Sequence, residues 1–356
     1  MSDVRFQRLE RRGARRLGDR LELEMSLPKT PSGMEARWCP LEDCAPRLFQ
    51  LGETTSDAEW NGAETRLHRT PHTPGTTCPY CGHDSADDHE FIDPRDVEAL
   101  TTWFKWAAQE DALDAVGNML RGVGRRLPRS GPISIQVTAN RRPARPEPRV
   151  WREDLLRQLT CNVCSRRYGV YAIALFCPDC GAPNLAVHYR RECDLIEQQI
   201  TLAREASEAE LSFRLLGNAH EDVVTALETY LKTVYRFLVG KQFQVEEAAK
   251  LKSAKAIGNA FQNIDRAREK LAKIGIDPVA GLSDDDRDYL RVNIEKRHVL
   301  GHNLGLADER YAEAVQEAQP GRTVVLLADE VVRFVEIASR LVQYLEAQAF
   351  PVIDAA

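Results

Sequence analysis

Apolar residues recur at helical spacing through most of the second half of the chain. Their stripes predict amphipathic helices over about 220–239, 245–274, 283–297 and 328–349. The third of these begins with a serine and three aspartates, residues that cap a helix and interact well with the positive end of its dipole. Four helices with polar connections are typical of a bundle, because each helix can bury its apolar stripe only against its neighbours.

The first half of the chain has a more varied pattern. Strands are expected over about 21–25 and 132–138, and a helix or a broken pair of helices is expected over 94–127. A charged helix over 191–216 would connect this half to the bundle. We therefore predict a multidomain α+β fold, in which a small N-terminal α+β region precedes an all-α helical bundle.

The length of the chain adds domain boundaries to this picture. At 356 residues the chain exceeds what one hydrophobic core usually organises. We expect an N-terminal region over 1–150, a cysteine-rich region over 151–190, a helical connector over 191–216 and the bundle over 217–356. No stretch approaches the roughly 20 apolar residues that span a bilayer, and the N-terminus lacks the apolar core of a signal peptide, so we predict a cytoplasmic protein with no membrane partner.

Charge is distributed unevenly along the sequence. The formal net charge of −6 excludes a surface that is basic everywhere, but arginines gather in the segments 5–20 and 122–152. Each segment is either a solvated linker or face, or a surface that contacts the phosphates of a nucleic acid. The sequence leaves both interpretations open.

Four cysteines in the middle of the chain have the spacing of a zinc ribbon. The two C-x2-C pairs are Cys161 with Cys164 and Cys177 with Cys180. Each short turn directs two thiolates at one point, and a hairpin between the turns would complete a tetrahedral site. Because the chain looks cytoplasmic, its thiols are expected to be reduced, and a structural Zn²⁺ is predicted here in preference to disulfides.

A second zinc site is predicted earlier in the chain, divided by a long insertion. Its pairs are Cys39 with Cys44 and Cys78 with Cys81, and His72 or His83 would be the substitute ligand if Cys44 were not used. Cys193 is left over and is interpreted as a small buried hydrophobic residue. With four protein ligands each, the two Zn²⁺ sites are expected to be structural, and no catalytic metal is expected.

The predicted bundle contains an arginine and two histidines that are suited to chemistry on RNA. They are Arg297, His298 and His302. An imidazole can move the proton of a ribose 2′-hydroxyl near neutral pH, and a guanidinium can stabilise negative charge on a phosphoryl group. A solvated or capping histidine pair at a helix end is the alternative, and a metal site completed by Asp308 or Glu309 is another.

On these residues the segment 205–350 resembles a HEPN domain, whose ribonuclease members carry an R-x4-6-H motif within a helical bundle. The resemblance implies that Arg297 and His302 are catalytic, with His298 assisting. The implied reaction is a metal-independent transesterification that leaves 2′,3′-cyclic phosphate and 5′-hydroxyl ends. It also implies a homodimer with a composite cleft. Five helical residues place an angle of about 140° between Arg297 and His302, and either such a dimer or a kink at Gly301 would bring the two side chains together.

The resemblance suggests two different classes of function. The first is an endoribonuclease with RNA as its partner, whose zinc region recognises RNA or senses a phage or regulatory protein, acting as a toxin in bacterial stress or antiphage defence. The second is a non-catalytic zinc-ribbon adaptor that binds nucleic acid, nucleotide or protein. Family toxins that pair with a nucleotidyltransferase antitoxin carry a tyrosine two positions after the histidine; Leu304 stands there, so that regulation is not expected.

Overall fold

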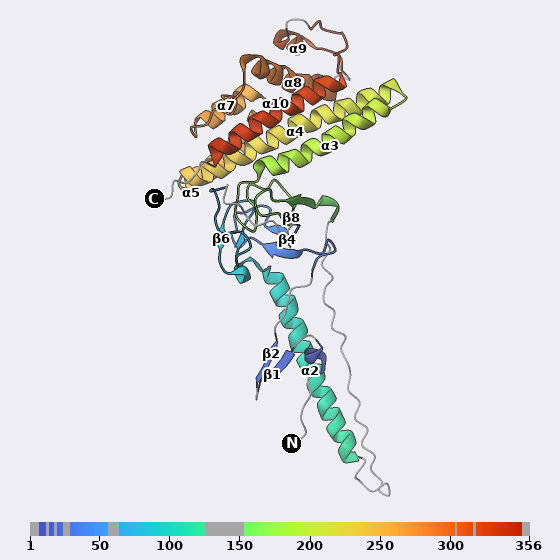
Figure 1. The fold of residues 1–356 in the computed structure, drawn as a ribbon, viewed down its shortest axis with the longest axis vertical. Helices are drawn as coiled ribbons and strands as arrows, with labels where there is room; N and C mark the ends of the chain where they lie inside the picture. Colours follow the sequence, from blue (N-terminus) through green and yellow to red (C-terminus); the bar gives the residue numbers. More distant parts are fainter. Residues whose placement is uncertain are drawn as a thin grey trace.

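The structure is a computed structural model with a helical C-terminal half and a mixed N-terminal half (Figure 1). It describes residues 7–11, 14–17, 20–23, 29–55, 64–124, 153–302, 305–315 and 318–350. The strand predicted over 132–138 lies outside these residues, as does most of the basic segment 122–152. No helix in the described ranges is long and apolar enough to cross a membrane.

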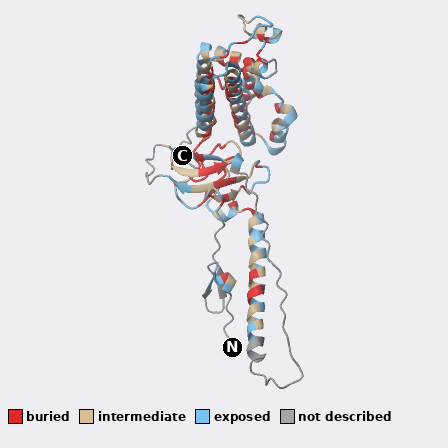
Figure 2. Cartoon of the chain, turned by 90° about the vertical axis from the view of Figure 1, so that its right-hand side faces the viewer, coloured by how far each residue is buried: buried red, intermediate tan, exposed pale blue. Residues whose placement is uncertain are grey.

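Three long helices form the main core of the C-terminal half. They are α3 (Leu185–Glu205), α4 (Ala209–Gln242) and α10 (Ala328–Ala349), and α8 (Asp284–His302) packs against α4 and α10. Their apolar stripes meet in one continuous buried cluster, which Figure 2 shows as the red inner faces of the helices. The shorter helical elements are α5 (Val245–Lys252), α6 (Ala254–Ile257), η3 (Ala260–Gln262), α7 (Ile264–Ala272) and α9 (Glu309–Ala314).

Two predicted helices are wrong in extent. The helix expected over 191–216 is the end of α3 and the start of α4, and α3 is part of the bundle core rather than a connector. The helix expected over 245–274 is broken into α5, α6, η3 and α7. Local capping explains these breaks: the Ser253 hydroxyl and the Asn263 side chain accept from backbone N–H groups and start new helices, and Gly258 has a positive φ.

The N-terminal half is built on a four-stranded antiparallel sheet in the order β3-β4-β8-β7. Its strands are β3 (Glu35–Trp38), β4 (Leu48–Thr54), β7 (Arg157–Thr160) and β8 (Arg166–Val170). Because β4 pairs with β8, segments from both sides of the predicted boundary at residue 150 share one sheet. That boundary therefore divides a single structural unit.

Smaller elements complete the N-terminal half. The pairs β1 (Ala14–Leu17) with β2 (Arg20–Leu23) and β5 (Thr76–Thr77) with β6 (Asp84–Ser85) are separate two-stranded ribbons, and η1 (Asp88–Phe91) and η2 (Glu153–Leu155) are single 3-10 turns. The 31-residue helix α2 (Pro94–Gly124) extends away from the sheet (Figure 1). The short helix α1 (Gln7–Glu10) packs on it, burying Leu9 against Ala107, while Arg8 pairs with Asp111 at 2.7 Å.

Aromatic rings join the sheet unit to the bundle. Phe176, Phe237 and Phe350 contact one another, with ring centroids 5.2–5.4 Å apart. Phe176 immediately precedes Cys177, whereas Phe237 lies on α4 and Phe350 follows α10. Aromatic pairs at these separations contribute about 0.5–1.5 kcal/mol each beyond the area that they bury. The cysteine-rich unit is therefore packed on the base of the bundle.

Candidate functional site

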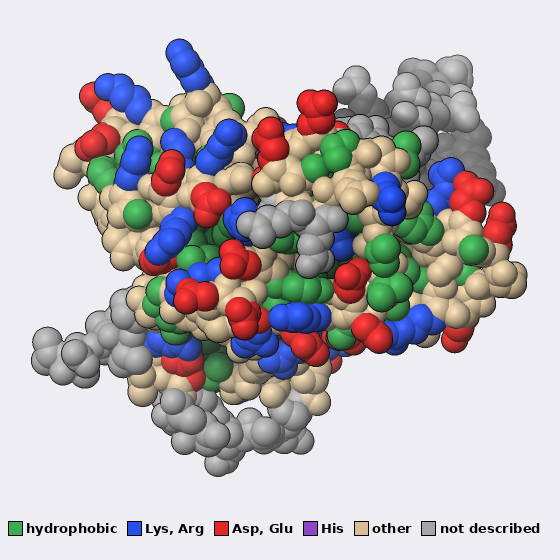
Figure 3. All heavy atoms as spheres, turned by 90° about the horizontal axis from the view of Figure 1, so that it is seen from above, with side chains coloured by type: hydrophobic (Ala, Val, Ile, Leu, Met, Phe, Trp, Pro, Cys, Tyr) green, Lys and Arg blue, Asp and Glu red, His purple; other side chains and the backbone are tan. Residues whose placement is uncertain are grey.

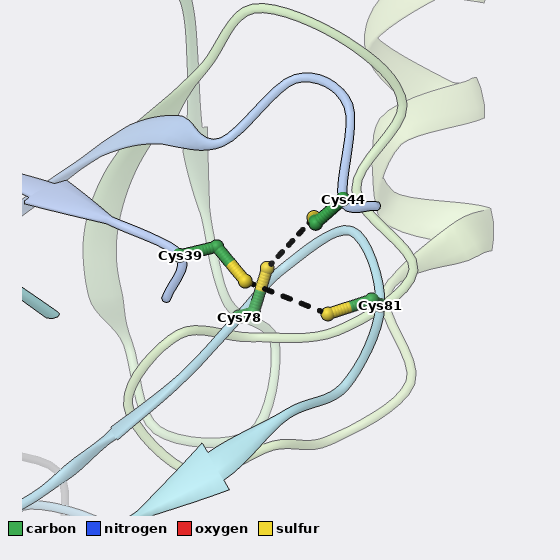
Figure 4. Close-up of side chains that lie close together, drawn as sticks. All are labelled: Cys39, Cys44, Cys78 and Cys81. Carbon is green, nitrogen blue, oxygen red and sulfur yellow. Dashed lines mark hydrogen bonds between the residues drawn. The ribbon is translucent and has the colours of Figure 1, made fainter. Parts of the chain in front are cut away.

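The structure gathers eight cysteines into two clusters of four, as the sequence predicts. Within each cluster all of the sulfur atoms lie within 4.8 Å of one another. The first cluster contains Cys39, Cys44, Cys78 and Cys81, whose side chains converge from two loops (Figure 4). The second contains Cys161, Cys164, Cys177 and Cys180.

The sulfur separations fit a tetrahedral metal centre better than disulfides. Cys39 Sγ lies 3.7 Å from Cys81 Sγ, and the Cys44–Cys78 separation is also 3.7 Å. In the second cluster the corresponding separations are 3.9 and 3.6 Å. Four sulfurs that each lie about 2.3 Å from a central Zn²⁺ are about 3.8 Å apart, whereas a disulfide requires about 2.05 Å.

Local hydrogen bonds explain how each loop positions its thiols. The β3–β4 turn contains Cys39 and Cys44, and Cys39 N–H donates to Arg47 O at 2.8 Å, which accounts for the wider spacing of this pair. The other loops are tighter: Cys78 N–H donates to His83 O at 2.7 Å, and Cys177 N–H donates to Ala182 O at 2.8 Å. Backbone N–H groups also point at sulfur, as in the Asp179 N–H to Cys177 Sγ contact of 3.4 Å.

Electrostatics also favours a cation in these clusters. Burial raises the pKa of the Cys177 thiol well above its ordinary value, and hydrogen bonding to the neighbouring thiol of Cys39 raises the pKa of Cys78. Four thiolates can share such a volume only around a positive charge. The eight cysteines could therefore hold two metal ions, with no position left for a substrate.

The alternative ligands are engaged elsewhere. Cys44 takes part in the first cluster, so neither histidine is needed as a substitute. His72 Nδ1 lies 3.1 Å from Asp179, and His83 Nε2 lies 3.0 Å from Glu90. Cys193 is buried outside both clusters and contacts the Ser339 hydroxyl at 3.6 Å, as expected for a small buried side chain.

The arginine–histidine segment lies at the C-terminal end of α8 and lines a polar cavity of about 340 Å³. Arg297 is half-buried and His298 is exposed, and both border this cavity. Arg266 from α7 and Arg310 from α9 also line it. Sequence reasoning missed these two arginines, because only the packing of α7 and α9 beside α8 brings them to the motif.

The charges in this cavity are partly compensated. Arg310 pairs with Glu295 at 2.9 Å, and the same carboxylate accepts from Asn263 Nδ2 at 3.0 Å. Arg297, in contrast, has no ion pair or side-chain hydrogen bond within the described part of the chain. Its guanidinium therefore keeps its donors for a ligand, and phosphate is the group that such a planar fork binds well.

A buried polar layer fixes the rotation of α8 behind the cavity. His220 on α4 lies 3.2 Å from Asn293 Oδ1, and Asn293 Nδ2 donates to Tyr289 O at 2.9 Å. Burial, helped by the nearby positive charges of Lys296 and Arg297, lowers the pKa of His220 to about 4, so its imidazole is neutral. This layer was not predicted, because the sequence alone does not show which polar residues beside an apolar stripe become buried when the helices pack.

His302 is the last residue of α8, and its side chain lies outside what the structure describes. Its approach to Arg297 therefore stays a prediction, as does the metal site that would use both histidines. His298 Nε2 lies 3.9 Å from Asp308 Oδ2. Asp308, one of the two residues expected to complete that metal site, is therefore close to His298.

The surface around the end of the bundle has mixed charge. Viewed from the end that carries α9, basic and acidic side chains alternate and do not form one basic field (Figure 3). Binding of a polyanion at this end would therefore depend on local groups such as the cavity arginines.

Comparison with known proteins provides no relative: no family model matches the chain, and no curated protein or solved structure is significantly similar to it. The two thiol clusters and the arginine-lined cavity are therefore the features that bear on function.

Proposed function

We propose that the protein is a metal-independent endoribonuclease with the HEPN type of active site. Arg297, His298 and His302 are its catalytic residues, and two copies of the chain form the composite cleft. The observation that carries the proposal is that Arg297 and His298 line one polar cavity together with Arg266 and Arg310. Three guanidiniums around one cavity suit a phosphodiester whose negative charge grows in the transition state.

The proposed reaction follows from the chemistry of these groups. A ribose 2′-hydroxyl loses its proton and its oxygen attacks the adjacent phosphorus, while the bond from phosphorus to the 5′-oxygen breaks. Arg297 stabilises the charge on the phosphoryl oxygens, and His302 takes part in proton transfer. The products are a 2′,3′-cyclic phosphate and a 5′-hydroxyl, and DNA is not cleaved because it lacks the nucleophile.

Each thiol cluster in this proposal holds a structural Zn²⁺. Thiolate sets with tetrahedral separations select zinc over the harder cations Mg²⁺ and Ca²⁺. The zinc unit would position RNA or receive a protein signal such as a phage component, and the enzyme would act as a toxin during bacterial stress or phage infection.

The proposal is tested with purified protein and total RNA. Wild-type protein should cut the RNA, and Arg297→Ala and His302→Ala should each lower the rate by at least about 100-fold. Arg291→Ala is the matched control, because Arg291 lies on the same helix but pairs with Asp288 outside the cavity. Absence of cyclic phosphate ends, or equal activity in all four proteins, would refute the proposal.

The second candidate function is a non-catalytic adaptor. It is favoured by the two four-cysteine clusters, because four-cysteine metal sites are common in modules that bind nucleic acid or protein. In that case wild-type protein and both active-site variants would be equally inert toward RNA and equally harmless when expressed in a host cell.

A further inference from the structure

Glu221 on α4 reaches directly over the backbone of α8 at Gly301. A Cβ atom added to Gly301 would overlap Glu221 Oε1, so the carboxylate would have to move. Glu221 is half-buried and lines the same cavity as Arg297 and His298. The carboxylate therefore occupies the space that a side chain at position 301 would fill.

The position of this carboxylate relates it to the motif. Gly301 follows Arg297 by four residues on a continuous helix, so the two residues lie one above the other on the same face. His298 precedes Gly301 by three residues and borders the same face. Glu221 thus borders the proposed active site beside Gly301, although it is far from the motif in sequence.

The carboxylate is not engaged by the protein in the part of the chain that the structure describes. No ion pair within 4.0 Å and no hydrogen bond involves its oxygens there, even though cationic groups line the same cavity. A half-buried carboxylate that served only to pack α4 on α8 would gain by pairing with one of these guanidiniums. Its acceptor capacity is instead available to a substrate.

The proposed transesterification requires one group that removes a proton and one that supplies a proton. We propose that Glu221 is the general base, an inference that rests on the proposed ribonuclease function. Its carboxylate accepts the proton of the 2′-hydroxyl as the new O–P bond forms. As the bond from phosphorus to the 5′-oxygen breaks, the protonated imidazole of His302 donates its proton to that oxygen. Arg297 holds the phosphoryl oxygens throughout.

The test separates the base from the acid by changing the leaving group. Two RNA substrates are compared, one ordinary and one in which sulfur replaces the bridging 5′-oxygen at the scissile bond. A thiolate leaves without needing a proton, so removal of the general acid should hardly slow cleavage of the sulfur substrate. Removal of the general base should slow cleavage of both substrates. Glu221→Gln should therefore cleave both substrates about 10²–10⁴-fold more slowly than wild type. His302→Ala should cleave the ordinary substrate slowly but regain the wild-type rate on the sulfur substrate.

Two further variants control for effects on folding. Gly301→Ala keeps the Glu221 charge but displaces its carboxylate, and alanine favours the helix, so this variant should be folded and slow. Asp222→Asn removes the neighbouring carboxylate, which pairs with Gln199 at 2.8 Å, and should match wild type. Thermal melting of all variants verifies the fold.

The outcomes distinguish the two proposals. If wild type cuts neither substrate, both the ribonuclease function and the role of Glu221 are refuted. If wild type cuts and Glu221→Gln is equally fast, or is restored by sulfur as His302→Ala is, then only the assignment of Glu221 as base is overturned.

Discussion

At the scale of single residues, His220 shows how burial sets a protonation state. The imidazole is fully buried against Phe334 and bonds Asn293, and the pKa of His220 falls from 6.5 to about 4. The folded protein therefore binds fewer protons than the unfolded chain between these two values. The stabilising contribution of the neutral imidazole is complete above pH 6.5 and is lost as the pH falls toward 4.

We expect this loss to be measurable by denaturant unfolding. Between pH 7.5 and 5 wild type should lose about 2 kcal/mol more free energy of unfolding than His220→Gln, which has no titrating group. The buried His188, with a pKa of about 3, is present in both proteins and cancels. If wild type and His220→Gln lost the same free energy of unfolding between pH 7.5 and 5, the assignment of a neutral His220 imidazole would be contradicted.

Two glycines give opposite predictions for the same substitution. Gly181 follows Cys180 with a φ of +71°, and a Cβ there would lie 2.5 Å from His68 Cβ. Gly181→Ala should therefore destabilise the protein by about 1–3 kcal/mol. Gly217 lies within α4 with nothing within 4 Å of an added Cβ, so Gly217→Ala should stabilise it by about 0.5–1 kcal/mol. Thermal melting of the two variants checks both signs.

At the scale of elements, helices could be predicted from the sequence where nearby residues, such as capping side chains, determine where the helix begins or ends. The helix over 328–349 is found as α10, and the Ser283 hydroxyl accepts from Asp286 N–H at 3.2 Å where α8 was expected to begin. The break between α3 and α4 could not be predicted, because the intervening residues are compatible with a helix. There the chain turns so that α3 can pack along α4.

The cysteine loops are local elements too, which is why both clusters were predictable. We expect two zinc ions per wild-type chain and one after Cys177→Ser, because three thiolates hold zinc much less tightly than four. Cys193→Ser is the matched control and should retain two, since Cys193 lies outside both clusters. Metal analysis of the purified proteins measures this. An unchanged metal content in Cys177→Ser would remove that residue from the ligand set.

At the scale of the whole molecule, the proposed active-site cavity depends on contacts between distant parts of the chain. Arg297 and His298 could be proposed from one short segment, but Glu221 could not, since nothing in the sequence shows which side of α4 faces α8. The shared sheet was missed for the same reason, because β4 and β8 are separated by more than a hundred residues.

The aromatic contact between the two halves predicts coupled stability. Removing the proposed zinc ions should lower the melting temperature of the bundle in wild type, because Phe176 next to Cys177 packs on Phe237. In Phe237→Ala the bundle should be less stable than in wild type by at least about 1 kcal/mol and should melt at a lower temperature. A chelator should then lower its melting temperature by less than it does in wild type. Circular dichroism with and without chelator measures both effects, and an unchanged chelator response would show that the halves unfold independently.

The long helix α2 has a practical consequence for measuring the size of the particle. Thirty-one residues at 1.5 Å each make a rod of about 46 Å, which extends from the body and raises its friction in solution. A monomer of 40.2 kDa should therefore elute early from a sizing column, and its scattering profile should have an extended tail. Light scattering, which reports mass independently of shape, is the measurement that separates an elongated monomer from the proposed pair of chains.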